Sequence, residues 1–281
     1  MDESAGQRDY GYYGPGSVAW KVGREAVVLL GGSRAVLMQL AHPLVAMGVS
    51  THSDYMSDPF GPAARTFMHG EWMMFGSLEK ARRSARTINR LHKGVHGFLP
   101  IDAGTYDSGA RYDARYPDLL LWVHATLVDT LLLCYDLFIG PLDEAEQDDY
   151  YQQSKAVAHL LGLLPEKMPT RVCDLKAYVQ EMVYSNQLAA TPQARRLAEQ
   201  VLFPPMPSIF RPAMHFNYQL TCALLPEPVR AIYGFEWDQQ RQRLFDLSAW
   251  GMRQVLPRLP MYLRELPITR RIIDQTVKLS A

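Results

Sequence analysis

Apolar residues recur at intervals of three and four along almost the whole chain. This spacing puts side chains on one face of a helix, so it predicts α-helices. Alternating runs of Val, Ile and Thr between Gly or Asn-Gly turns do not occur in the sequence, and we therefore expect no strand. The pattern predicts an all-α protein with a single helical domain over residues 15–281, preceded by an N-terminal arm of residues 1–14.

Capping and helix-breaking residues predict where the helices begin and end. Ser17 can cap a helix that runs to about Leu30, and Ser33 can cap a second that runs to about Val49 and that Pro43 interrupts after His42. Further helices are expected near residues 62–75, 77–96, 143–163, 171–186, 191–203, 207–225 and 238–256, with another that starts at Pro117. A loop over residues 97–116 precedes that helix.

The helix that starts at Pro117 is the most apolar of the chain, and it contains His124. Counting by fours and threes, the histidine shares a stripe with Leu120, Leu127, Leu131, Cys134 and Phe138, so we expect it to face the core. A buried histidine can donate to a backbone carbonyl, and it can also offer a neutral ring nitrogen to a metal or haem. The periodicity alone leaves both interpretations open.

Charge and cysteine content narrow the function classes. The 281 residues include 29 basic and 29 acidic ones, dispersed along the chain, so nothing favours binding to nucleic acid. Three cysteines in no paired motif indicate a reducing, cytoplasmic setting. The N-terminus does not resemble a signal peptide, and Asp129 and Asp136 interrupt the one apolar stretch long enough to span a membrane, so we expect no transmembrane segment.

Several familiar motifs can be set aside. Gly14-Pro-Gly16-Ser-Val-Ala19 matches a dinucleotide fingerprint, but no hydrophobic strand precedes it. The sequence contains no Glu-x-x-His for a di-iron bundle, no His-Glu-x-x-His and no Gly-x-Ser-x-Gly. His92 and His96 stand four residues apart, yet no third ligand accompanies them, so a hydrogen-bonded or exposed pair is favoured over a metal site.

A series of separated motifs resembles one known family. The motifs are Leu40-Ala-His42-Pro43, His52-Ser-Asp54, Asp58-Pro59-Phe-Gly61, Arg65-Thr66, Phe75-Gly76, Arg90-Leu-His92, Trp122-Val-His124-Ala-Thr126, Leu225-Pro226, Arg230 and Tyr233-Gly234. In order and spacing they resemble the rubber oxygenases (latex-clearing proteins) and MpaB-like oxygenases, over roughly residues 15 to 260.

The resemblance implies an all-helical fold with a globin-like core, flanking helices and a b-type haem whose iron is bound by His124. The rubber-cleaving members carry a Lys that can occupy the sixth iron position, and this chain has Arg65 there, with Pro62 where those members have an Arg. Guanidinium has no lone pair for iron, so we predict a sixth position that is open or holds water or an exogenous ligand, with Arg65 and Thr66 as catalytic hydrogen-bond donors above it.

Further cofactor and proton-transfer roles follow from the same resemblance. Arg90, within the basic series Arg82, Arg83, Arg86 and Arg90, is a candidate for binding the haem propionates, although a solvated basic face also explains most of that series. Trp122 is a candidate cofactor contact because it lies in the matching motif. His42, His52 and Glu71 are possibilities for a general base.

The predicted function is a haem b-dependent oxygenase, an oxidoreductase with O2 on the iron opposite His124 and an apolar, unsaturated, isoprenoid-like or polyprenyl substrate. A protein that binds haem or senses a ligand without turnover is one alternative, because the Lys and Arg of the rubber-cleaving members are replaced. A haem-free helical scaffold in which His124 is merely buried is another.

Overall fold

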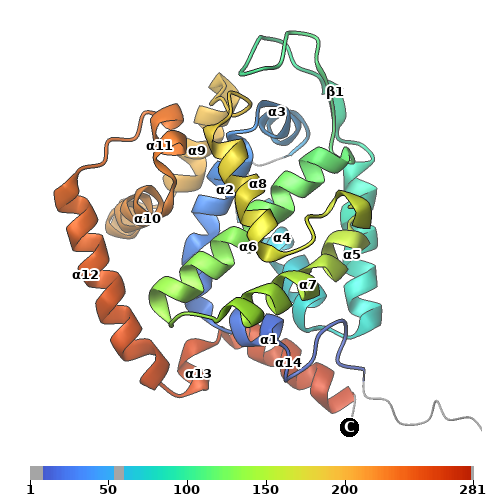
Figure 1. The fold of residues 1–281 in the computed structure, drawn as a ribbon, viewed down its shortest axis with the longest axis vertical. Coiled ribbons are helices and arrows are strands. Elements are labelled where there is room, and N and C mark those ends of the chain that lie inside the picture. The colour runs from blue at the N-terminus through green and yellow to red at the C-terminus, as the bar shows by residue number, and fades with distance from the viewer. Residues whose placement is uncertain (1–8, 54–59, 280–281) are drawn as a thin grey trace, which may run out of the picture.

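The computed structural model describes residues 9–53 and 60–279, with the side chains of all of these except Phe60, Pro62 and Ala63. The described chain is mostly helical (Figure 1). Its α-helices are α1 (Val18–Gly23), α2 (Gly32–Leu40), α3 (Pro43–His52), α4 (Phe60–Phe75), α5 (Leu78–His92), α6 (Pro117–Phe138), α7 (Glu144–Leu160), α8 (Val172–Tyr184), α9 (Pro192–Leu202), α10 (Arg211–Leu224), α11 (Glu227–Tyr233), α12 (Gln239–Val255), α13 (Met261–Arg264) and α14 (Pro267–Leu279). Short 3-10 helices are η1 (Ala26–Gly31), η3 (Pro165–Lys167), η4 (Ser208–Phe210) and η5 (Leu256–Arg258).

Helix α6 occupies the centre of the domain (Figure 1). It packs against η1, α2, α8, α7 and α12. Helix α4 packs against α5, which lies on one side of the molecule, and α12 forms the opposite outer edge (Figure 1). The long apolar helix that the sequence predicts is therefore the central element of a mostly helical single domain, as expected.

The expectation of no strand is wrong in one place. Residues His96–Phe98 (β1) and Arg111–Asp113 (β2) pair as an antiparallel hairpin, with His96 opposite Asp113 and Phe98 opposite Arg111. Strands of three residues are too short for an alternating pattern to be recognised. The hairpin supports the second, smaller core cluster, in which Tyr112 and Leu99 are buried.

Most predicted helix starts coincide with the observed ones. The Ser17 side chain caps α1, Ser77 caps α5, and Pro117 stands in the first turn of α6. The first predicted helix instead ends at Gly23 and continues as η1, and the chain bends by 105° at the break before Pro43. Helices α11, α13 and α14 were not predicted from the sequence.

One side of α6 is tightly packed. Trp122 is fully buried, and its indole N–H donates to the Met38 carbonyl at 3.2 Å. Asp129 forms an ion pair with the buried Arg34 of α2 at 2.7 Å, and Arg34 also donates to Thr130 and to the Leu224 carbonyl. The acidic residue that interrupts the apolar stretch thus has a partner inside the protein.

Helix α6 is long and apolar enough to cross a membrane, and 56% of its apolar window is buried inside the protein. The bent pair η1–α2 and α3 passes the same test of length and composition. A mostly buried core helix passes that test as readily as a membrane span does, so the finding is weak evidence for a span.

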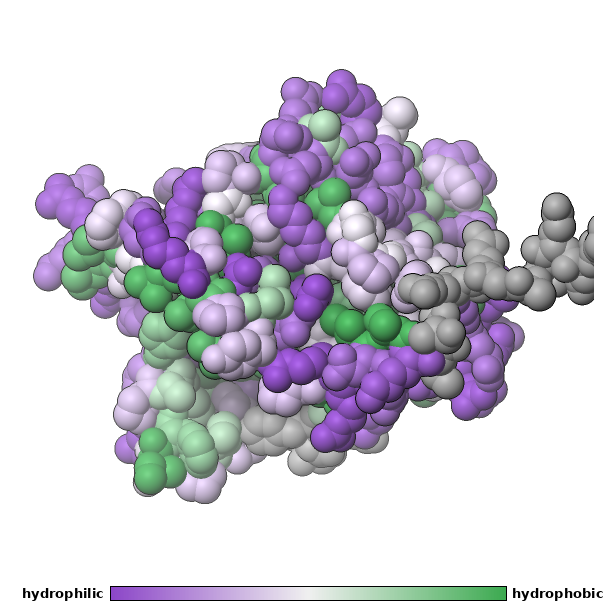
Figure 2. Space-filling model, turned by 90° about the horizontal axis from the view of Figure 1, so that it is seen from below, coloured by the Kyte–Doolittle hydropathy of each residue, from purple (hydrophilic) through white to green (hydrophobic). Residues whose placement is uncertain are grey.

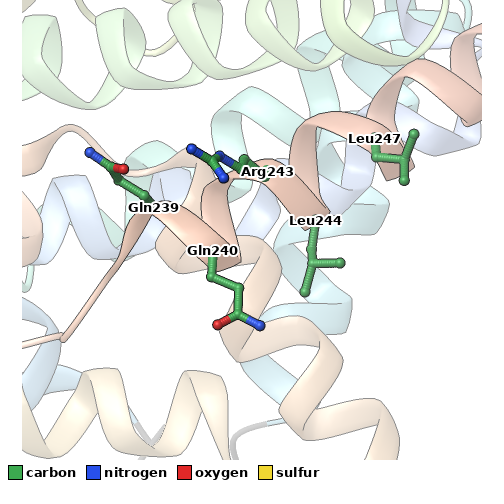
Figure 3. Close-up of a pocket in the computed structure, with 5 residues that line it drawn as sticks. All are labelled: Gln239, Gln240, Arg243, Leu244 and Leu247. Carbon is green, nitrogen blue, oxygen red and sulfur yellow. The ribbon is translucent and has the colours of Figure 1, made fainter.

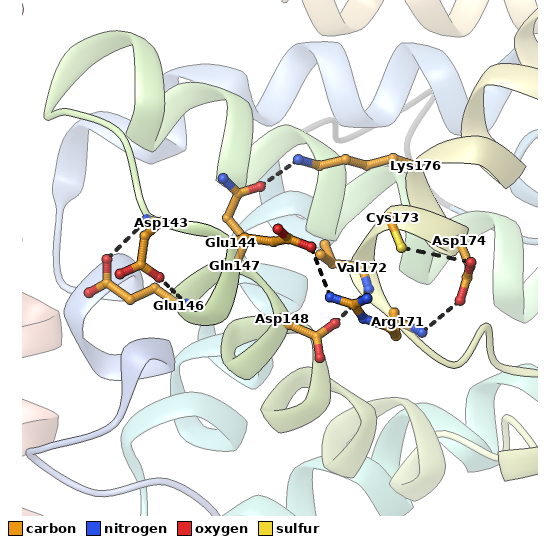
Figure 4. Close-up of polar contacts among 10 residues, drawn as sticks. All are labelled: Asp143, Glu144, Glu146, Gln147, Asp148, Arg171, Val172, Cys173, Asp174 and Lys176. Atoms are coloured by element: carbon orange, nitrogen blue, oxygen red, sulfur yellow. Dashed lines mark hydrogen bonds and ion pairs between the residues drawn. The ribbon is translucent and has the colours of Figure 1, made fainter.

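Helix α7 is fixed in place at its start, which matters because it faces His124. Asp143 and Glu146 form a capping box at its N-terminus (Figure 4). Glu144, the first residue of the helix, pairs with Arg171 at 2.9 Å, and Asp148, one turn further on, accepts from the Val172 backbone N–H at 2.8 Å (Figure 4). These contacts join α7 to the first turn of α8 and so set its position along α6.

Candidate functional site

His124 of α6 faces α7. Its Nε2 lies 3.2 Å from the Ser154 hydroxyl, and its ring centroid lies 6.3 Å from that of Tyr151. The Ser154 hydroxyl donates its only proton to the Tyr151 carbonyl, at 2.7 Å. Ser154 can therefore only accept from His124, which puts the ring proton on Nε2 and leaves a lone pair on Nδ1.

The imidazole is held in its neutral form. The side chain is half-buried by exposed area, while protein atoms surround the ring closely. Burial, and to a smaller extent the nearby charge of Lys155, lower the pKa of His124 to about 4. At neutral pH the ring thus carries one N–H and one lone pair, as a metal ligand requires.

The stripe that contains His124 does not face a closely packed core, contrary to the expectation from periodicity. Leu120, Val123 and Leu131 keep accessible surface, and Leu127 is 44% exposed. The stripe becomes buried only at its C-terminal end, at Cys134 and Phe138. The first three turns of α6 therefore present an apolar face that the neighbouring helices leave partly open.

These features fit a metalloporphyrin in part. Haem iron takes a histidine ring nitrogen that bears a lone pair, normally Nε2, and a partner on the other nitrogen orients the ring. With Ser154 at Nε2, the nitrogen of His124 that is left for iron is Nδ1, the reverse of that usual arrangement. The accessible Leu120, Val123, Leu127 and Leu131 are the apolar side chains that a flat macrocycle would contact. Among the described residues of α6, His124 therefore combines a ring nitrogen that has a lone pair with accessible apolar side chains on the same helix face.

The other predicted site residues lie elsewhere. Arg65 and Thr66 are on α4 and Arg90 is on α5, all at exposed positions, so their roles stay predictions. Trp122 lies on the packed side of α6, with its ring 6.4 Å from that of Tyr178, because two residues along a helix turn the side chain away from His124. Asp58, a possible partner for Arg65, is outside the described residues.

The three possible general bases each belong to a separate hydrogen-bonded pair. His42 bonds through Nε2 with the Tyr106 hydroxyl at 3.1 Å, and His52 Nε2 lies 3.1 Å from the Tyr112 hydroxyl. Glu71 accepts from the Thr269 hydroxyl of α14 at 2.6 Å. None of these hydrogen bonds includes His124.

Burial shifts the pKa values of two of these groups in opposite directions. It lowers the pKa of His42 to about 4 and raises the pKa of Glu71 to about 6. His42 is therefore neutral at pH 7, with a buried Nδ1 that has no hydrogen-bond partner. Glu71 titrates close to neutrality, in the range that suits a proton-transfer group.

No cluster of three metal-ligating side chains is found in residues 9–53 and 60–279. His92 ends α5, whereas His96 begins β1, so the two do not share a helix face.

Sequence reasoning missed Ser154 and Tyr151, which determine the state of His124. They follow it by about 30 residues, on a different helix, and no sequence motif links them to it. Only the packing of α7 against α6 brings them together.

Residues 20–254 match the family model described as "ER-bound oxygenase mpaB/B'/Rubber oxygenase, catalytic domain". This chain belongs to that family. The match begins within α1 and ends one residue before the end of α12, so it includes α4, α6 and α7.

Two curated relatives are similar over most of the MpaB/rubber oxygenase domain. The uncharacterised proteins Rv2237 of Mycobacterium tuberculosis and Mb2261 of Mycobacterium bovis are each 29% identical over 218 residues, which is 75% of this chain and 82% of the relative. No solved structure matches the chain. Membership in an oxygenase family implies an oxidoreductase that uses O2 and a second substrate.

Proposed function

We propose that this member of the MpaB/rubber oxygenase family is a haem b-dependent oxygenase that acts on an apolar, unsaturated, isoprenoid-like substrate. The observation that carries the proposal is the neutral His124, oriented by Ser154 on a partly open apolar face of α6. The family match supports the oxygenase class. The proposal includes the globin-like arrangement of helices around the cofactor that the resemblance implies.

His124 is the residue that would bind the haem iron. Ser154 accepts the Nε2 proton and so holds the ring in one tautomer, in the way that outer partners orient metal-binding histidines. Haem, when bound, would supply the redox-active iron at which dioxygen is activated.

The surrounding side chains set the kind of substrate. Leu120, Val123, Leu127 and Leu131 offer hydrocarbon surface next to His124, which suits an apolar substrate. Arg65 and Thr66 of α4 are proposed as donors that stabilise charge developing on oxygen, which is the role such groups have where water is excluded. Arg90 is proposed to pair with a propionate.

The first experiment measures haem directly. The chain, expressed with haem supplied, is expected to show a Soret band and stoichiometric haem in a pyridine-haemochrome assay. His124→Ala is expected to lose most of the haem, and His159→Ala, which replaces an exposed histidine in the last turn of α7, is expected to keep it. If His124→Ala retained full haem content and an unchanged spectrum, the ligand assignment would be wrong.

The second experiment separates an oxygenase from a protein that binds haem without turnover. The exposed positions of Arg65 and Thr66 favour the protein that binds haem without turnover. Donors that stabilise charge in a catalytic pocket are expected to be buried, and these two are not. Consumption of O2 with a polyisoprene or a shorter isoprenoid supports the oxygenase. A haem-loaded chain that consumes no O2 with either class supports the binding protein.

A further inference from the structure

Helix α12 carries two apolar faces, and the fold uses only one of them. On the inner face, Phe245 contacts Phe138 of α6 with ring centroids 6.5 Å apart, and Ala249 is the one buried residue of the helix. A surface helix normally needs a single apolar stripe to pack on its domain. The second face of α12 therefore calls for another explanation.

The outer face is exposed and made of large apolar side chains. Leu244, Leu247, Trp250 and Val255 of α12 are 56–65% exposed, and Tyr262 and Leu263 of α13 continue the exposed series at 59% and 58%. We call these six residues the α12–α13 surface. Figure 2 shows apolar residues gathered on the side of the molecule that α12 occupies, at the left in both views.

The polar neighbours of two of these leucines are uncharged or cationic. Leu244 and Leu247 share the first turns of α12 with Gln239, Gln240 and Arg243 (Figure 3). The polar members of this group are amides and one guanidinium, with no carboxylate among them. An apolar surface bordered by cationic groups differs from the mixed charge of an ordinary solvated face.

The charge around the α12–α13 surface is positive. From the start of α12 to the end of α13, residues 239–264 contain five Arg and one acidic residue, the exposed Asp246, although the whole chain is neutral. Two of the five, Arg241 and Arg264, form ion pairs with Asp238 and Glu25. Arg243 and Arg258 are exposed next to the apolar residues, at the start of α12 and in η5. A second copy docked on this surface by a two-fold axis would bring the arginines of both copies into one interface, which opposes self-association.

We propose that the α12–α13 surface binds peripherally to an anionic lipid bilayer, with α12 lying in the plane of the headgroups. Exposed Leu, Trp and Tyr side chains enter the acyl boundary, and Arg243 and Arg258 pair with anionic headgroups. This proposal does not depend on haem, so it can fail or succeed separately from the proposed oxygenase activity.

The test is flotation of the full-length protein with vesicles of phosphatidylcholine alone or with about one third phosphatidylglycerol. Binding is expected with the anionic vesicles and is expected to weaken steeply with added salt. Leu244→Gln with Leu247→Gln is expected to lower the partition coefficient about tenfold or more on anionic vesicles. Arg243→Gln with Arg258→Gln is expected to lower it about tenfold at low salt, with no change on neutral vesicles.

Phe98→Ser is the matched control, because Phe98 of β1 is 67% exposed and belongs to the hairpin rather than to this surface. It is expected to bind vesicles as the natural chain does, and thermal unfolding checks that every variant is folded. Absence of wild-type binding to anionic vesicles would overturn the proposal. So would a dimer in light scattering that the paired leucine change converts to a monomer, because a second copy would then cover the surface.

Discussion

Helices α6 and α12 both present large apolar side chains that the fold does not bury, yet the two exposed faces differ in their polar residues. In α6 the open face contains Leu120, Leu127 and a neutral His124, with no charged side chain. In α12 it contains Leu244 and Leu247 beside Arg243. A partly open apolar face on the central helix, without charged side chains of its own, suits a hydrophobic cofactor, whereas a face bordered by arginine at the outer edge suits an anionic surface.

The contacts on the packed side of α6 should contribute more to the free energy of unfolding than contacts at the surface. Arg34→Met removes the cation that pairs with Asp129 at 2.7 Å and leaves that carboxylate without its partner. We expect a loss of about 3–5 kcal/mol in the free energy of unfolding, measured by urea denaturation. Arg83→Met, which breaks an exposed ion pair with Glu79, should change it by less than about 0.5 kcal/mol. Equal effects of the two substitutions would show that α6 is not anchored through Arg34.

The pH dependence of stability tests the neutral state of His124. Its pKa is about 4 in the folded chain against 6.5 for an ordinary histidine, so between these values the unfolded chain binds more protons. Stability is therefore complete above pH 6.5 and falls as the pH drops toward 4. His124→Gln should reduce the slope in this window by up to about 1.4 kcal/mol per pH unit, whereas the exposed His159→Gln should not. An unchanged slope would mean that protonation of His124 costs the folded chain little free energy.

Glu71 contributes with the opposite sign. Its pKa rises from 4.5 to about 6 on burial, so the folded chain binds more protons between these values and stability falls as the pH rises through them. Glu71→Gln keeps an acceptor for Thr269 and removes the charge. We expect Glu71→Gln to raise the free energy of unfolding by about 2 kcal/mol at pH 7 and to leave it unchanged at pH 4, measured by urea denaturation at both pH values. A loss at pH 7 would indicate that the carboxylate has a cationic partner.

The sequence predicts much of the fold because helix caps act locally. Ser17, Ser77 and Pro117 mark helix starts through contacts within their own first turn, and all three are confirmed. The β1–β2 hairpin and helix α14 were missed, because strands of three residues show no periodicity and α14 follows a segment broken by prolines.

The candidate site could be predicted only in part. The pattern singled out His124, whose role as a ligand stays a prediction. Its stripe was expected in the packed core, and burial depends on which helices cover which face. Periodicity shows which residues share one face of a helix, but it does not show which other helix packs on that face. Ser154 of α7 therefore could not be predicted as the partner of His124. The family motifs supplied Arg65 and Thr66, whose exposed positions leave their role a prediction.

Ser154 provides a finer test of the open face of α6. Ser154→Ala removes the acceptor for the His124 Nε2 proton and frees the ring to change tautomer. We expect haem affinity to fall about tenfold, measured by titration with haemin, while Ser154→Thr keeps the hydroxyl and restores most of the affinity. A shift in the ¹⁵N resonances of the His124 ring in the haem-free Ser154→Ala chain would report the tautomer change independently of haem. Unchanged affinity and unchanged resonances would show that the serine does not position the ring.

Removing an exposed leucine from α12 should affect stability much less than removing a buried leucine from α6. Leu247→Ala removes a side chain that is 65% exposed, whereas Leu132→Ala removes one in α6 that is 6% exposed. The first should change the free energy of unfolding by less than about 0.5 kcal/mol and the second should lower it by about 2–5 kcal/mol, both from urea denaturation. A leucine on a free surface has no cavity to leave behind, so its removal costs little in the absence of lipid. If Leu247→Ala cost as much as Leu132→Ala, that face of α12 would be covered in the folded protein in solution, and it would not be available to a bilayer.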